Sequence, residues 1–338
     1  MKRQVPTVGL IIEDSTSDYL PIIFMFGGQG SQHYQMGVKL YEHNYIFKDS
    51  LNKASEILKE LDPAYPWLID EIYNNSVHLP FKNLQYTHPA IIAVEYALYQ
   101  ALIAEGIKPD YLLGSSLGEF TAAVAAESCS LRQALFLSLK QAKLIEDHCL
   151  NGGLTAVLGP VELYKKLDLS QKVALAGINF DNHFTIAALD QELSLAESYL
   201  REKEVNYQRL PVEYGFHSSR IDRAEFEFKE STRNLRFNNP GIPILSGYDG
   251  TQIREISQDY FWNAVRNLLN FQKIIQKLEQ SRNAIYVDLT PNGTLANFVK
   301  YNLGPNSKSK YYSILSAFNT EIKNLKKLKE ELPVVQDY

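Results

Sequence analysis

Apolar and polar positions along the chain follow two patterns, short apolar runs and longer stretches with helical spacing. Runs typical of buried strands occupy residues 20–32, 110–113, 242–247 and 284–290. Helical spacing is found in residues 46–61, 87–105, 118–127 and 131–149, and a Lys-rich stretch at 323–329 indicates the solvated face of a final helix. Strands that alternate with helices predict a mostly parallel sheet, which is the α/β class.

The pattern changes in the middle of the chain. Residues 154–210 contain, in order, LTAVLG, VELYKKLDL, KVALAGIN, HFTIAAL, ELSLAESYLREKE and VNYQRL. These segments predict the order strand, helix, strand, strand, helix and strand, which is that of a ferredoxin-like unit. We therefore expect a small inserted subdomain at 153–210. The catalytic subdomain is expected to consist of 20–152 and 211–315, and a C-terminal helix and tail to follow at 316–338.

The composition is that of an ordinary globular protein. Of the 338 residues, 45% are apolar and 22% are charged, which argues against disorder. The net charge of −5 lacks the basic character of a nucleic-acid-binding protein. No apolar run reaches the roughly 18–20 residues of a membrane span, and the stretch from Val8 to Ile12 is too short for a signal peptide. We expect a soluble, cytoplasmic protein with no nucleic-acid or membrane partner.

Cysteine usage gives little indication of special chemistry. The chain has two cysteines, Cys129 and Cys149, which are too few for a disulfide framework or a zinc site. We expect both to be reduced thiols on helices, and we expect no metal centre.

The stretch LLGSSLGEF contains the strongest candidate for catalysis. Residues 114–118 fit the pattern G-x-S-x-G with Ser116 at its centre, between a predicted strand and a helix that starts at Leu117. Such a turn exposes the serine oxygen, and the amide of Leu117 at the helix N-terminus could stabilise an oxyanion. Ser115 has the wrong phase, because it would need glycines at the positions of Leu113 and Leu117. The alternative interpretation is a glycine-flanked turn without chemistry.

A nucleophilic serine needs a base, and the chain has seven histidines. His217, in RLPVEYGFHSSRID, lies where the small subdomain returns to the main sheet, a natural place for a base that reaches across a cleft. His148 stands beside two acidic residues and is expected at the surface. His88 precedes a proline at a helix start and is expected in a cap region. We therefore favour His217 as the partner of Ser116.

Five motifs together resemble one known family. FGGQGSQHYQMG, THPAIIAVEYAL, GIKPDYLLGSSLGEFTAA, VEYGFHS and DLTPNGTL follow each other in this order. They resemble the malonyl-CoA:acyl carrier protein transacylase family, which includes the acyltransferases of polyketide synthases, over roughly residues 20–315. The resemblance implies an α/β-hydrolase-like large subdomain with an inserted ferredoxin-like small subdomain.

The resemblance also implies roles for single residues. Ser116 is implied as the nucleophile, His217 as its base, and the backbone amides of Gln29 and Leu117 as the oxyanion hole. Gln272, in LLNFQKII, matches the position whose carbonyl orients the histidine. No bound cofactor is implied, since the acyl groups are carried on the phosphopantetheine of an acyl carrier protein or on CoA. The implied partner is the acyl carrier protein of a polyketide synthase, and we expect a monomer.

Departures from the family pattern concern the acyl pocket, in which Tyr214 and Phe216 are further implied substrate-binding residues. Members that load malonyl or methylmalonyl groups carry an arginine where this chain has Gln141, and a carboxylate that enters without an ion partner is strongly disfavoured. The flanking residues Lys140 and Lys143 point elsewhere on a helix. Ser115 stands where the family usually has histidine, which widens the pocket. Neutral acyl groups should therefore be preferred to malonyl.

A smaller branch of the family is more similar still. The chain resembles the stand-alone acyltransferase homologues of trans-acyltransferase polyketide systems at five positions, Gly27, Tyr34, Gln35, Met36 and Gln141. At position 27 the family often has proline. The stand-alone homologues act as acyl hydrolases that remove stalled acyl groups from carrier proteins.

Three functions stay open. The first is hydrolysis of acyl thioesters on a carrier protein, and the second is transfer of acetyl, malonyl or another acyl group between CoA and a carrier protein. The third is a noncatalytic docking partner, which is disfavoured because the Ser–His motif elements are all present. Asp288, in the DLTP turn, is a candidate acid partner for His217 but is expected to be structural.

Overall fold

A computed structural model describes residues 19–248 and 250–332. The N-terminal stretch on which the exclusion of a signal peptide depends lies outside these residues, so that interpretation stays a prediction. Within the described part of the chain, every helix is too short or too polar to cross a bilayer.

The large sheet has six strands in the order β11-β10-β1-β2-β7-β8. The strands are β1 (Ile22–Phe26), β2 (Tyr111–Gly114), β7 (Ile244–Ser246), β8 (Gln252–Ile253), β10 (Ile285–Asp288) and β11 (Lys310–Ser313). All neighbours pair in parallel except the edge pair β7–β8. The predicted mostly parallel α/β sheet is thereby confirmed.

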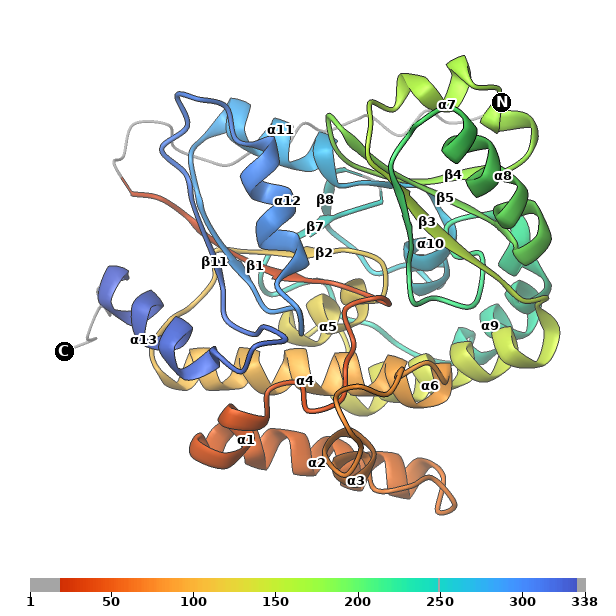
Figure 1. Ribbon diagram of the computed structural model, residues 1–338. Helices are drawn as coiled ribbons and strands as arrows, with labels where there is room; N and C mark the ends of the chain where they lie inside the picture. The colour runs from red at the N-terminus through yellow and green to blue at the C-terminus, as the bar shows by residue number, and fades with distance from the viewer. Residues whose placement is uncertain (1–18, 249, 333–338) are drawn as a thin grey trace, which may run out of the picture.

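Helices cover both faces of this sheet (Figure 1). Those in the first half of the chain are α1 (Val38–His43), α2 (Tyr45–Leu61), α3 (Leu68–Tyr73), α4 (Leu84–Ala104), α5 (Gly118–Ala125) and α6 (Leu131–His148). Those in the second half are the 3-10 helix η2 (Ser219–Ala224), α9 (Glu225–Thr232), α10 (Tyr260–Arg266), α11 (Phe271–Ser281), α12 (Thr294–Asn302) and α13 (Glu321–Glu331).

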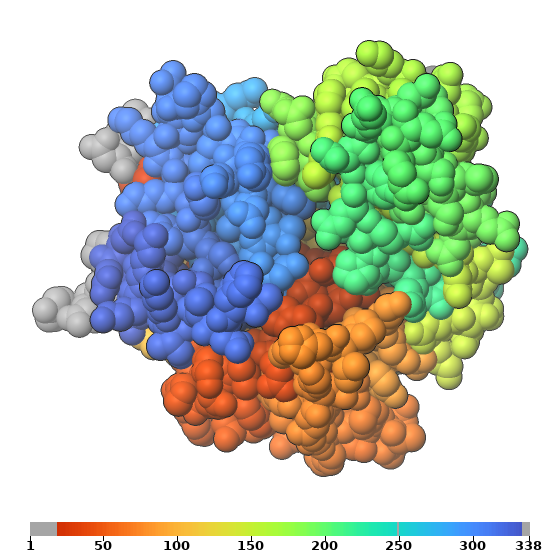
Figure 2. All heavy atoms as spheres, in the orientation of Figure 1, coloured from red at the N-terminus to blue at the C-terminus, as the bar shows by residue number. Residues whose placement is uncertain are grey.

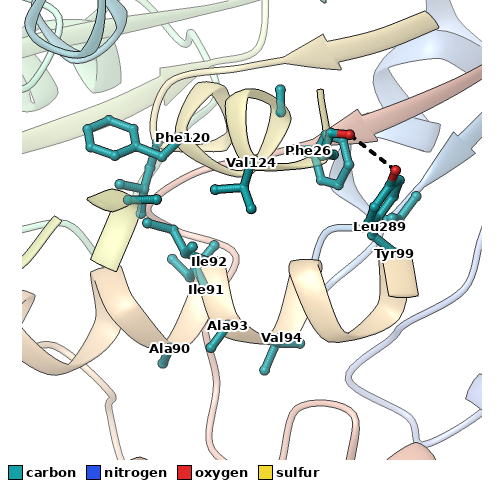
Figure 3. Packing of buried hydrophobic residues seen from close by; sticks show 14 of the residues in the cluster. Phe26, Ala90, Ile91, Ile92, Ala93, Val94, Tyr99, Phe120, Val124 and Leu289 are labelled. Carbon is teal, nitrogen blue, oxygen red and sulfur yellow. Dashed lines mark hydrogen bonds between the residues drawn. The ribbon is translucent and has the colours of Figure 1, made fainter. Parts of the chain in front are cut away.

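Alternate residues of β1 show how the two faces are buried. Phe24 and Phe26 pack into the core that α4 and α5 share, and Figure 3 shows Phe26 beside apolar side chains of these two helices. Ile23 and Met25 belong to the opposite core, with residues of α11 and α12. A strand that is apolar on both sides is expected in a parallel sheet covered on both faces, which explains the continuous run IIFMF.

The second sheet forms the small subdomain, in the order β6-β3-β5-β4-β9. Its strands are β3 (Gly152–Val157), β4 (Ala174–Phe180), β5 (His183–Leu189), β6 (Tyr207–Arg209) and β9 (Leu269–Asn270). Its helices are α7 (Glu162–Lys166), η1 (Leu169–Gln171) and α8 (Asp190–Glu202). Chain order β3-α7-β4-β5-α8-β6 agrees with the predicted ferredoxin-like unit. Strand β9, from outside the predicted range 153–210, pairs in parallel with β4.

The surface is hollowed where the two subdomains meet. Figure 2 shows this hollow between the green segment of the second sheet and the blue C-terminal segment, with red N-terminal residues at its base. The strand β9 lies on the connection between α10 and α11, so this connection links the two sheets.

Two expectations about single residues were wrong. Cys129 and Cys149 are buried free thiols, but neither lies within a helix: Cys129 is in the turn after α5, and Cys149 is the C-cap of α6. His88 lies inside α4 and is buried, because the cap of this helix is Asn83, five residues earlier. His148 is exposed, as expected, and contacts Glu227.

Candidate active site

Ser116 occupies a strained turn between β2 and α5. Its φ angle is +58°, in the left-handed region that residues with a side chain rarely adopt. A Cβ on Gly114 would lie 2.7 Å from the Cα of Glu119, and a Cβ on Gly118 would clash with the carbonyl of Phe26. Both glycines are therefore required for the sharp connection of strand and helix, as the G-x-S-x-G pattern predicts.

The side chains of Ser116 and His217 meet across 101 residues of sequence. Ser116 Oγ lies 2.9 Å from His217 Nε2, and both side chains are buried. His217 Nδ1 lies 2.8 Å from the backbone carbonyl oxygen of Asn267. Because a carbonyl only accepts, Nδ1 carries the proton and Nε2 is left to accept the serine hydroxyl. This is the arrangement of a nucleophile and its general base.

Burial lowers the pKa of His217 to about 4. The hydrogen bond to the carbonyl of Asn267 opposes this shift, and the positive charge of Arg266 adds to it. The imidazole is therefore neutral near pH 7, which is the form that can take a proton from Ser116.

The prediction that Gln272 orients the histidine was wrong. The orienting carbonyl belongs to Asn267, the C-cap of α10. A carbonyl at the end of a helix has no partner inside the helix, so it is free to accept from the imidazole. The side chain of Gln272, near the start of α11, instead donates to Asp181 Oδ1 at 2.5 Å. Sequence reasoning missed Asn267 because a backbone acceptor leaves no mark on the residue type.

The loop after β1 approaches the turn that holds Ser116. A Cβ on Gly28 would lie 2.9 Å from Ser116 Cβ and 3.0 Å from the nitrogen of Leu117. Within the described residues, the amides of Gln29 and Leu117 donate no hydrogen bond. The side-chain carbonyl of Gln29 accepts from Thr87 Oγ1 at 3.2 Å. Both amides are therefore unoccupied by an acceptor among the described residues, and their role as an oxyanion hole stays a prediction.

Two buried acids support this turn, and sequence reasoning did not assign either of them. Glu95 accepts from the amide of Gly27 at 2.7 Å and from Thr121 Oγ1 at 2.8 Å. Glu119 accepts from Ser246 Oγ at 2.6 Å and from the hydroxyl of Tyr260. The available signal was an acidic residue inside an otherwise apolar helix, as in AIIAVEYAL.

Asp288 is the last residue of β10, directly before the loop that leads into α12. Its carboxylate accepts from the amides of Thr290 and Ala296, each at 2.8 Å. Burial raises the pKa of Asp288 to about 6. These contacts hold the start of the helix, whereas Nδ1 of His217 is occupied by Asn267.

The predicted acyl-pocket residues differ in exposure. Gln141 and Ser115 are buried, and Gln141 has no hydrogen-bond partner for either side-chain polar atom among the described residues. Phe216 is buried and Tyr214 is half-buried. Lys140 is half-buried and Lys143 is exposed, so neither shares the buried position of Gln141. The role of Gln141 in an acyl pocket stays a prediction.

Comparison with known proteins agrees with this geometry. Residues 23–335 match the family model described as acyl transferase domain. The chain is 39% identical over 308 residues to polyketide biosynthesis acyltransferase homolog PksD of Bacillus subtilis (strain 168), covering 90% of this chain and 94% of the relative. It is 36% identical over 315 residues to the homolog BaeD of Bacillus velezensis, covering 92% and 97%.

Solved structures share the fold. The acyltransferase domain from module 8 of the salinomycin polyketide synthase aligns with a TM-score of 0.83 at 22% identity, over 92% of this chain and 74% of that chain. MCAT from Streptococcus pneumoniae aligns with a TM-score of 0.76 at 24% identity, over 92% and 100%. The match of residues 23–335 to the family model shows that the chain belongs to the acyl transferase domain family.

Proposed function

We propose that the protein hydrolyses neutral acyl groups from the phosphopantetheine arm of an acyl carrier protein in polyketide biosynthesis. The observation that carries this proposal is the contact of Ser116 Oγ with the neutral imidazole of His217, combined with an uncharged, buried Gln141. The names of the relatives PksD and BaeD support a role in polyketide biosynthesis.

The first half-reaction forms an acyl-enzyme. Ser116 Oγ attacks the thioester carbonyl carbon while its proton passes to His217 Nε2. The amides of Gln29 and Leu117 stabilise the negative oxygen of the tetrahedral intermediate. When the C–S bond breaks, His217 returns the proton to the departing thiolate. The products are a serine ester and the free phosphopantetheine thiol.

The second half-reaction releases the acyl group. His217 accepts a proton from water, and the water oxygen attacks the ester carbonyl. Collapse of the second tetrahedral intermediate breaks the ester C–O bond, and His217 protonates Ser116 Oγ. A free carboxylic acid leaves, and the enzyme returns to its starting state with all protons accounted for.

A neutral acyl group fits the electrostatics that we assign to the pocket. A buried carboxylate without a cationic partner is costly, and Gln141 offers an amide where malonyl-loading members of the family carry arginine. Lys140 and Lys143 do not occupy the same buried position.

The second candidate function is transfer of the acyl group to another thiol, between CoA and a carrier protein. It uses the same serine, histidine and amides, and it is favoured by the family to which the chain belongs. The noncatalytic interpretation is disfavoured, because Ser116 and His217 lie within hydrogen-bonding distance.

Incubation with acetyl-loaded carrier protein, followed by intact-protein mass spectrometry, separates these functions. Hydrolysis predicts loss of the acetyl mass in the absence of any acceptor. Transfer predicts loss only when CoA or an unloaded carrier protein is added, with the acetyl mass appearing on the acceptor. If the loaded protein persists under both conditions, and Ser116 never gains the acetyl mass, the proposed catalysis is wrong.

A further inference from the structure

Three polar side chains have buried atoms that lack hydrogen-bond partners among the described residues. They are the side-chain amide nitrogen of Gln29, both ring nitrogens of His88, and both polar atoms of Gln141. His88 and Gln141 are completely buried. Buried polar groups in native proteins nearly always have partners, so unsatisfied groups that lie together indicate a missing water or ligand.

Helices α4 and α6 pack against each other, and His88 and Gln141 lie at similar positions along the two helix axes. Near the start of α4, the amide of Leu84 donates to Glu146 Oε1, near the end of α6, at 2.8 Å. Further along α4, Tyr96 lines the same surface pocket as Leu131, the first residue of α6. The two helices are therefore antiparallel. One turn after Leu84 is His88, and about one turn before Glu146 is Gln141.

Contacts of His88 and its neighbour lead toward the nucleophile. The rings of His88 and Phe216 lie with centroids 5.8 Å apart, and Phe216 directly precedes His217. Thr87, beside His88, donates to the side chain of Gln29, one residue from the Gly28 backbone that approaches Ser116. The unsatisfied ring of His88 on α4 thus lies against Phe216, the residue directly before the candidate base His217.

None of these groups carries a charge under ordinary conditions. Glutamine has no titratable proton, and burial lowers the pKa of His88 to about 3, so its ring is neutral. A carboxylate on the acyl chain would find no cation here. An uncharged oxygen would find an amide N–H and an imidazole N–H, while an alkyl chain that displaced water would leave them unpaired.

We propose that His88 and Gln141 bind an uncharged oxygen substituent, a hydroxyl or keto oxygen, on the acyl chain held at Ser116. This inference rests on the proposed acyl-thioester function and adds the class of acyl group that the site prefers. Specificity of this kind arises because a site with buried polar atoms rejects the analogue that lacks the matching oxygen.

The test compares two acyl thioesters of equal length on the full chain. 3-Hydroxybutyryl and butyryl thioesters of N-acetylcysteamine are each mixed with the enzyme, using both hydroxyl enantiomers, and acylation of Ser116 is followed by quenched intact-mass spectrometry. This step is common to hydrolysis and transfer. We expect at least one hydroxy enantiomer to react about tenfold faster than butyryl, a ratio that corresponds to about 1.4 kcal/mol.

Two variants and a matched control assign the preference to the named residues. Gln141→Leu and His88→Phe should each reduce the ratio of the hydroxybutyryl to the butyryl acylation rate to about one. Ser138→Ala removes a buried hydroxyl from the same helix, one that is already paired with the carbonyl of Leu135, and should keep the ratio. Circular dichroism checks that each variant is folded.

The outcomes separate this inference from the proposed function. Equal rates for both thioesters in the unmutated enzyme, or a preference for butyryl, would overturn the inference while acylation itself supports the proposed function. A preference that persists in both variants would also overturn it, because other groups would then bind the oxygen. Failure of both thioesters to acylate Ser116 would reject the proposed function together with the inference.

Discussion

The amide of Gly27 donates a 2.7 Å hydrogen bond to Oε1 of Glu95, a fully buried carboxyl group on α4. The other oxygen of Glu95 accepts from Thr121 on α5 at 2.8 Å. One side chain thus joins the loop that contains Gln29 to the helix that follows Ser116. A proline at position 27, frequent in the family that the sequence resembles, has no N–H and could not make the first bond.

Glu95→Ala should therefore impair both stability and catalysis. It leaves the Gly27 amide and the Thr121 hydroxyl unpaired in the core, which costs roughly 2–5 kcal/mol of unfolding free energy with the cavity included. Movement of the Gln29 loop should lower kcat about 10- to 100-fold, less than outright loss of an oxyanion donor typically costs. Urea unfolding and acyl-enzyme kinetics measure the two effects.

Glu95→Gln is the matched control. Its carbonyl can still accept from Gly27, and its amide can donate to the hydroxyl of Thr121. Activity per folded molecule should stay within about threefold of the parent. If the Gln variant were as inactive as the Ala variant while remaining folded, the charge of Glu95 rather than its hydrogen bonds would matter.

Ser116→Ala should abolish acylation, and Ser115→Ala should leave most of it. Ser116 has the left-handed φ angle and contacts His217, whereas Ser115 has neither feature. Loss of a catalytic serine lowers kcat by about 10⁶-fold in well-studied hydrolases. Incubation with an acyl thioester, followed by the mass of each variant, makes the comparison. If the Ser116→Ala variant became acylated at the rate of the parent enzyme, the nucleophile would be another residue.

The sequence predicts much of this fold because the elements that matter have strong local signals. The run IIFMF, buried on both faces, and the glycines around Ser116 are each determined by neighbours that leave little choice of residue. The partnership of Ser116 with His217 came partly from the position of His217 at a subdomain boundary and partly from the resemblance. The distance of 2.9 Å between Ser116 Oγ and His217 Nε2 agrees with this partnership.

Other features depend on contacts that the residue type does not reveal. The carbonyl of Asn267 acts through the backbone, so any residue could occupy this position, and Gln272 was a wrong choice for that reason. His88 was expected in a cap because a proline follows it. Tertiary packing placed both inside α4. Pro89 is the sixth residue of this helix and cannot donate to the carbonyl of Gln85, which instead accepts from the hydroxyl of Tyr65 at 2.9 Å.

The acid limb of the pH–rate profile should lie near pH 4. Burial lowers the pKa of His217 to about 4, so its neutral form, the competent base, persists well below the ordinary histidine pKa of about 6.5. kcat/KM for a neutral thioester should be constant from about pH 5.5 to 7 and fall as the pH drops through 4. Circular dichroism at each pH separates this loss from acid unfolding. A limb near 6.5 would indicate a solvated, ordinary imidazole.

Asp288→Asn should lower stability without a large kinetic effect. One carboxylate oxygen accepts from the amide of Thr290 in the loop before α12, and the other accepts from Ala296 in the first turn of α12. An asparagine side chain turns one of these acceptors into an N–H₂ donor. We expect a loss of roughly 1–3 kcal/mol in unfolding free energy, with kcat/KM per folded molecule within about threefold of the parent. A folded variant whose kcat fell by several orders of magnitude would instead indicate a Ser–His–Asp triad.

Gln141→Arg should shift the preference of the enzyme from neutral acyl groups toward malonyl. Gln141 is fully buried and its side-chain atoms have no partners among the described residues, so a guanidinium there could pair with a malonyl carboxylate through two hydrogen bonds. Without that carboxylate the same cation is buried and unpaired, so acetyl and butyryl should react more slowly. The gain for malonyl is expected to be partial, because Ser115 stands where the family usually has histidine.

Specificity is a ratio of kcat/KM values, so the parent and the variant must each be measured with both malonyl and acetyl thioesters. We expect a change of about 10- to 100-fold in the malonyl-to-acetyl ratio, the size of a charged hydrogen-bonded contact. Lys143→Arg is the matched control, because it adds a guanidinium to an exposed position two residues away on the same helix and should leave the ratio unchanged. A parent enzyme that already prefers malonyl by about tenfold or more would contradict the assignment of Gln141 and would require another cation beside the acyl group.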